Sequence, residues 1–74
     1  MLEKEHILQA LADTRKKIDG IEGLHIPVTL KTIEEYEQAG ADEHFIQQQR
    51  VHLQKLYAMA AELKEKAQRL QARL

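Results

Sequence analysis

The apolar positions in the second half of the chain recur in alternating steps of three and four residues. This spacing keeps one stripe of a helix facing a neighbouring helix, as in a coiled-coil seam. Residues 42–73 contain neither Pro nor Gly, so the sequence predicts one long uninterrupted helix there. The stripe consists of Ile46, Gln49, Leu53, Leu56, Ala60, Leu63, Ala67, Leu70 and Leu74, with Gln49 as its one polar member.

The length of this predicted helix limits how it can be covered. At its usual rise per residue, a helix of this length is a rod of about 45–50 Å. A compact domain of this size has a radius of gyration of only about 11 Å. We therefore expect the stripe to be covered by other helices placed end to end, by a second copy of the chain, or by a foreign partner.

The first half predicts two shorter helices. An apolar stripe of Ile7, Leu8, Leu11 and Ile18 indicates a helix over residues 3–19. Gly20 and Gly23 predict its end, and Pro27 disfavours helical backbone at the residue before it. Residues 20–28 are therefore expected to form a loop, and we expect it to be ordered and packed inward because a flexible linker would be polar, whereas this segment contains Ile21, Leu24, Ile26 and Val28.

A short helix over residues 29–39 is expected next, with Thr32 and Glu35 arranged as a capping box. Gly40 predicts its end, and Asp42 is a suitable N-cap for the long helix. The connection between these two helices is so short that they can pack only as an antiparallel hairpin. The prediction is a single all-α domain, residues 1–74, ordered as helix, ordered loop, short helix, tight turn and long helix. This helical hairpin is expected to assemble as an antiparallel coiled-coil or helical-bundle dimer.

Apolar residues beside the seam, namely Phe45, Tyr57 and Met59, widen the apolar band of the long helix. A band this broad favours a bundle of three or more helices. The predicted interface with a second chain or a partner helix contains nine residues. They are Ile46, Gln49, Leu53, Leu56, Tyr57, Ala60, Leu63, Ala67 and Leu70.

Charge is distributed unevenly, although the net charge is only −1. Residues 34–43 carry five acidic side chains and no basic one, whereas residues 50–74 carry six basic and two acidic. This polarity suits antiparallel packing of two chains, and ordinary solvated helix faces are the alternative interpretation. The balanced total does not favour direct nucleic-acid binding by this chain alone.

Candidate chemistry is sparse, because the sequence has no Cys and no Ser. His44 and His52 are eight residues apart, too far to hold one metal ion within a single helix. His25, in the predicted loop, is a candidate pH sensor. We expect no enzymatic activity, no cofactor and no metal, and, since no apolar run is long enough to span a bilayer, a cytoplasmic protein without a membrane segment.

The segment Ile26–Tyr36, followed by Gly40 and a long helix rich in Gln, Leu and Lys, resembles part of the MerR-type transcription regulators. Leu30, Lys31 and Ile33 match the turn and helix that precede the dimerisation helix of that family. The resemblance covers about residues 24–74 and implies a dimerisation module related to a transcriptional regulator. The chain lacks that family's winged-helix DNA reader, so the resemblance does not imply site-specific DNA binding.

A second resemblance is to the small helical-hairpin chaperones of type III secretion needle subunits. It rests on the turn and the start of the long helix, from Ala39 to Gln49. It implies a chaperone or adaptor that binds a partner helix in an apolar groove. Both readings describe a protein interaction module, and they differ in whether the partner is a second copy or a foreign helix.

Overall fold

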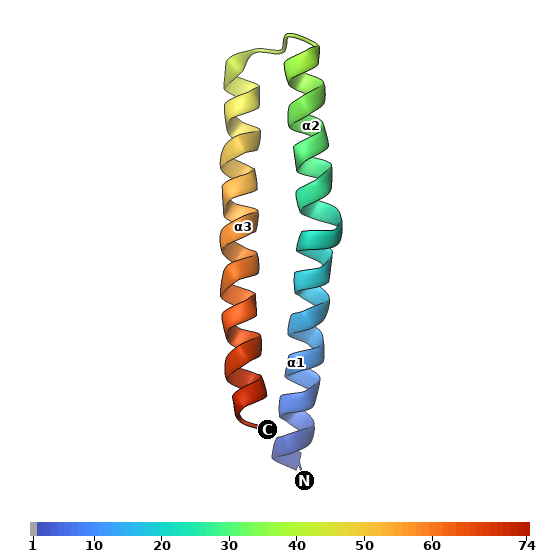
Figure 1. Cartoon of the computed structure of the whole chain (residues 1–74), viewed down its shortest axis with the longest axis vertical. Helices are drawn as coiled ribbons and strands as arrows, with labels where there is room; N and C mark the ends of the chain where they lie inside the picture. Colours follow the sequence, from blue (N-terminus) through green and yellow to red (C-terminus); the bar gives the residue numbers. More distant parts are fainter. Residues whose placement is uncertain (1) are drawn as a thin grey trace.

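The computed structural model describes residues 2–74, and it is an antiparallel helical hairpin (Figure 1). Helix α1 (Leu2–Gly20), the π-helical segment η1 (Ile21–His25) and helix α2 (Ile26–Gln38) follow one another without a break. We call them together the first arm. Helix α3 (Glu43–Ala72) is the second arm and lies alongside the first. The predicted all-α hairpin with its long C-terminal helix is confirmed.

The hairpin is elongated, with principal extents of 57 × 15 × 12 Å and a radius of gyration of 16.6 Å. This radius is well above the value expected for a compact domain of the same length. The long stripe of α3 is covered by the helical segments of the first arm placed end to end, which is the first of the three possibilities raised by the sequence.

The core lies between the two arms. Its centre is a cluster of Ile21, Ile26, Leu56 and Ala60, with Leu53 and Leu63 packed against it. The other buried apolar side chains lie toward the ends of the hairpin, and they are Ile7, Leu11 and Ile46. A two-helix contact of this kind buries one stripe of each helix and leaves the other faces in solvent.

The predicted loop over residues 20–28 is wrong, because the first arm is helical from Leu2 to Gln38. The spacing of the residues that face α3 shows why this segment can be helical. They follow steps of three and four residues except for one step of five, from Ile21 to Ile26. A π-helical turn accommodates one extra residue without breaking the helix, and η1 occupies this step. The apolar stripe therefore stays in phase on both sides. The inward positions are Ile7, Leu11, Thr14, Ile18, Ile21, Ile26, Thr29 and Ile33.

Pro27 is placed at the first turn of α2 rather than after a loop. A proline inside a helix has no N–H to donate and crowds the carbonyl four residues earlier, here that of Gly23. The wider π-turn lies directly before it, and the Ile26 N–H donates to the carbonyl of Ile21, five residues back. We attribute the continuity of the arm to this pairing of a π-turn with proline.

Two threonines take inward positions in the first arm that would otherwise hold larger apolar residues. Thr14 and Thr29 are buried, and their hydroxyls donate to the carbonyls of Ala10 and His25 at 2.7 and 2.8 Å. Each hydroxyl is thus satisfied within its own helix. Thr32 does the same toward Val28 at 2.9 Å, so the predicted capping box at Thr32 is wrong and that residue lies within α2.

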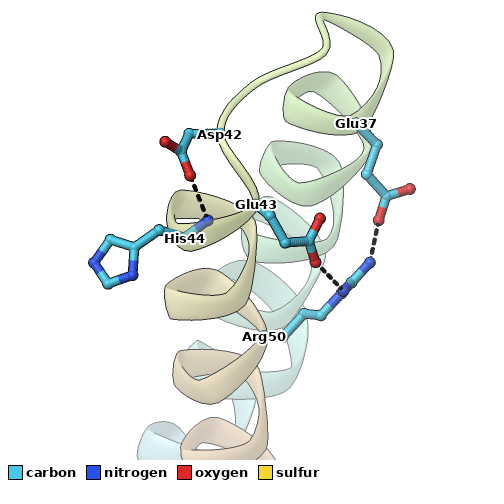
Figure 2. A network of polar contacts seen from close by, with 5 residues as sticks. All are labelled: Glu37, Asp42, Glu43, His44 and Arg50. Carbon is cyan, nitrogen blue, oxygen red and sulfur yellow. Dashed lines mark hydrogen bonds and ion pairs between the residues drawn. The ribbon is translucent and has the colours of Figure 1, made fainter.

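The turn between the arms has the predicted features: Gly40 ends α2 and Asp42 caps α3. Gly40 has a φ of +69°, and the Ala41 N–H donates to the carbonyl of Tyr36 at 2.9 Å, which closes α2 as a Schellman motif. The Asp42 side chain accepts from the His44 N–H at 2.8 Å, as an N-cap of α3 (Figure 2).

An ion-pair network at the turn joins the two arms. The guanidinium of Arg50 reaches Glu37 of α2 at 2.8 Å and Glu43 of α3 at 3.3 Å (Figure 2). All three side chains are substantially exposed, so we expect this network to contribute at most about 1 kcal/mol.

The glycines provide a test of the continuous first arm. A Cβ added at Gly20 or Gly23 meets nothing within 4 Å, and neither residue has a positive φ. We expect Gly20→Ala and Gly23→Ala each to stabilise the fold by about 0.4–1 kcal/mol, because alanine restricts the unfolded chain. Gly40→Ala is the matched control and should destabilise by about 1 kcal/mol, because its positive φ strains an alanine. Urea unfolding measures all three, and destabilisation by Gly20→Ala and Gly23→Ala would argue for a loop.

Candidate interaction surface

The seam predicted as an interface lies inside the hairpin. Ile46, Leu56 and Ala60 are 5, 5 and 4 % exposed in the single chain, and they face the first arm. Five further seam residues are half-buried, namely Gln49, Leu53, Leu63, Ala67 and Leu70. Of the nine residues predicted, Tyr57 is the one that lies exposed. A second chain that contacts the folded hairpin would therefore meet the residues that flank this seam, and the dimer itself stays a prediction.

One edge of the hairpin is joined by polar contacts, and we call it the polar edge. Seven residues are two turns of a helix in a coiled-coil contact, so Arg50, Tyr57, Lys64 and Gln71 share this edge of α3. Lys64 pairs with Glu22 at 2.6 Å, and Arg15 donates to Gln71 at 3.1 Å. Together with the Arg50 pair at the turn, these contacts connect three of the four positions to the first arm.

The opposite edge of α3 carries Phe45, His52, Met59, Lys66 and Arg73, again seven residues apart. We call it the groove edge. Its one ion pair among the described residues joins Arg73 to Glu3, at the open end of the hairpin. Midway along the rod, a surface hollow of about 480 Å³ opens on this edge. Its walls are formed by Lys17, Gly20, Ile21, His25, His52, Leu56, Met59 and Leu63.

The hollow exists because of the π-turn and a glycine. Gly20 contributes no side chain to its wall, and η1 supplies Ile21 and His25. Across the hollow, Met59 is 49 % exposed although it is apolar. The core residues Leu56 and Leu63 form the remaining apolar wall. The groove edge therefore presents an apolar depression lined by three large apolar side chains of α3.

Large apolar side chains are exposed more often than they are buried in the described chain. Eleven are exposed, against six that are buried when the small Ala60 is set aside. Scattered single exposures are normal for a surface, but an apolar side chain beside an apolar hollow marks a candidate contact site. The exposed set is Leu2, Leu8, Leu24, Val28, Leu30, Tyr36, Phe45, Val51, Tyr57, Met59 and Leu74.

The histidines are distributed over both arms. His25 and His52 both border the hollow, whereas His44 lies at the start of α3 beside Phe45, with ring centroids 6.3 Å apart. Within residues 2–74, no three His, Cys, Asp or Glu side chains are grouped so that they could hold a metal ion. No helix in the described part of the chain is long and apolar enough to cross a membrane.

The groove edge was missed at the level of sequence, because its hollow depends on the helical conformation of residues 20–28. The five-residue step between Ile21 and Ile26, inside an otherwise regular stripe, was the signal that could have revealed it. Phe45 and Met59 were recognised as flanking the seam, but their common edge and its contrast with Tyr57 were not recognised.

Comparison with known proteins adds no further information: no family model matches the sequence, and neither curated proteins nor solved structures give a match. The resemblance to the dimerisation region of MerR-type regulators and the resemblance to needle-subunit chaperones therefore both stay predictions.

The burial of Leu56 within one chain predicts how the seam responds to a charge. We expect Leu56→Asp to unfold the hairpin, since an unpaired carboxylate in the central cluster costs several kcal/mol. Tyr57→Asp changes the adjacent, exposed position and should leave the helix content unchanged. Far-ultraviolet circular dichroism distinguishes the two, and a fully helical Leu56→Asp variant would show that the seam is not the hairpin core.

Proposed function

We propose that this protein is a non-enzymatic helical interaction module that self-associates into a helical bundle through its groove edge. The observation that carries the proposal is the difference between the two edges. One is connected across the hairpin by polar pairs, and the other presents Phe45, Met59 and an apolar hollow.

The small core of the single hairpin supports this proposal. Apolar burial is the main favourable term in folding, and a chain of this length buries little of it when folded alone. Here the central cluster contains only four buried residues, and the two arms bury apolar side chains only along the narrow contact between them. Stacking a second hairpin on the groove edge buries the hollow and turns a two-helix contact into a four-helix bundle.

A foreign helix is the other candidate occupant of the groove edge. The chain would then be a small chaperone or adaptor that binds an amphipathic helix in its groove. The hollow, which is open to solvent and has four apolar side chains among its walls, supports this second candidate as well. The two candidates differ in the state of the purified protein, since only self-association produces a dimer without a partner.

We expect sedimentation equilibrium of the purified chain to give twice its 8.6 kDa mass at micromolar concentration. A mass that stays at one chain across the accessible concentrations would reject self-association. Such a monomer, stabilised by an added amphipathic helix, would instead favour the adaptor function.

A pair of matched variants tests the choice of edge. Met59 and Tyr57 are 49 and 46 % exposed and two residues apart, but they lie on opposite edges of α3. Met59→Lys should weaken the dimer about tenfold or more, which corresponds to about 1.4 kcal/mol, because it places a charge against apolar surface. Tyr57→Lys should leave the dissociation constant within about twofold. Equal effects of the two variants, measured by sedimentation, would reject the groove edge as the interface.

A further inference from the structure

We infer that the partner on the groove edge is a second copy running antiparallel, with a two-fold axis that passes beside Met59. This inference rests on the proposed self-association and adds the orientation and centre of the contact. In this arrangement α3 packs against α3 of the other copy, and each first arm packs against the other first arm.

The position of the hollow along the rod is the first reason. Met59 is 16 residues after the first residue of α3 and 13 before its last, so the hollow lies near mid-length. A two-fold axis presents the same patch from both copies. When two rods lie antiparallel in full overlap, only a patch near their middle meets its own copy. A patch at mid-length is therefore suited to this symmetry.

The charges along the groove edge are the second reason. In an antiparallel pair centred on Met59, Phe45 of one copy meets Arg73 of the other, since both are 14 residues from the centre. A guanidinium over an aromatic ring is a favourable contact. In a parallel two-fold pair stacked on the groove edge, α3 of one copy would lie over the first arm of the other, so this contact would not form. The Phe45–Arg73 contact therefore favours the antiparallel orientation.

A second line of α3 residues, next to the groove edge on the side away from the first arm, also favours the antiparallel orientation. It contains Gln48, Lys55, Glu62 and Arg69, seven residues apart. About the same centre, the antiparallel arrangement places Lys55 of one copy beside Glu62 of the other, and Glu62 beside Lys55 in return. The parallel arrangement, which places α3 over the first arm of the other copy, would not form this pair. This row therefore favours opposite directions through two equivalent ion pairs.

The ends of the rods are also complementary. Residues 34–43, at the turn, carry five acidic side chains and no basic one. Residues 64–73, at the open end of α3, carry four basic side chains and one acidic. Antiparallel docking brings the acidic turn of each copy toward the basic end of the other, whereas parallel docking stacks two acidic turns.

The absence of cysteine from the sequence makes a direct test possible, because each introduced thiol is the only one in its chain. A disulfide needs Cα atoms within about 4.4–6.8 Å. Met59→Cys should form a covalent dimer under mild oxidation, since it lies beside the axis. Tyr57→Cys, at nearly the same height on the polar edge, is the control and should stay uncrosslinked.

Orientation is tested with cysteines at the two ends of the groove edge. Phe45→Cys and Arg73→Cys are each about 21 Å from Met59 along α3. Neither variant alone should crosslink, and an equimolar mixture should give the mixed covalent dimer. Non-reducing gel electrophoresis followed by mass measurement reads out each product.

Each result has a defined meaning. Rapid self-crosslinking of Phe45→Cys and of Arg73→Cys would overturn the antiparallel orientation. Crosslinking of Tyr57→Cys but not of Met59→Cys would overturn the position of the axis. Either result, obtained while sedimentation still shows a dimer, rejects this inference and leaves self-association intact. A monomer in sedimentation, with no crosslinking in any variant, rejects the proposed function itself.

Discussion

The hairpin depends on keeping one apolar stripe in phase along the whole length of the first arm. The stripe runs in steps of three and four residues, and it would rotate out of the contact where five residues separate Ile21 from Ile26. The π-helical segment η1 absorbs that extra residue, so Ile21 and Ile26 both join the central cluster. Without this local widening, either α1 or α2 would turn its apolar face away from α3. The central core, the continuity of the arm and the hollow on the groove edge all follow from it.

The same feature connects the fold to its proposed role. A π-turn changes the spacing of the side chains around it, and such turns are frequent at functional sites. Here it lies opposite Met59 and beside Gly20, at mid-length, and leaves an apolar depression on one edge. The polar contacts of Lys64 and Arg50 occupy the other edge. One inserted residue therefore contributes both to the stability of the hairpin and to the asymmetry of its surface.

The sequence predicted the helical class, the long α3, the Gly40 turn and the Asp42 cap, because each depends on local patterns with a well-defined physical cause. It did not predict the helical path of residues 20–28. Gly20, Gly23 and Pro27 each favour a break when considered singly, and tertiary packing against Leu56 and Ala60 overrides them. The sequence also could not identify the helix that packs against the seam. The periodicity indicates that the stripe is covered by a helix, but it does not indicate which helix. The different edges occupied by Met59 and Tyr57 could be recognised only from the way the two arms pair in the structure.

Because a hairpin reverses direction once, the start of α1 and the end of α3 lie at the same end, opposite the turn (Figure 1). In the pair that we infer, the two copies point in opposite directions, so their termini lie at opposite ends of a rod whose longest extent is 57 Å. Any domains tethered to the two copies would be kept apart by nearly that length. The hairpin would then act as a molecular spacer, setting the separation of its attachments by the length of its helices.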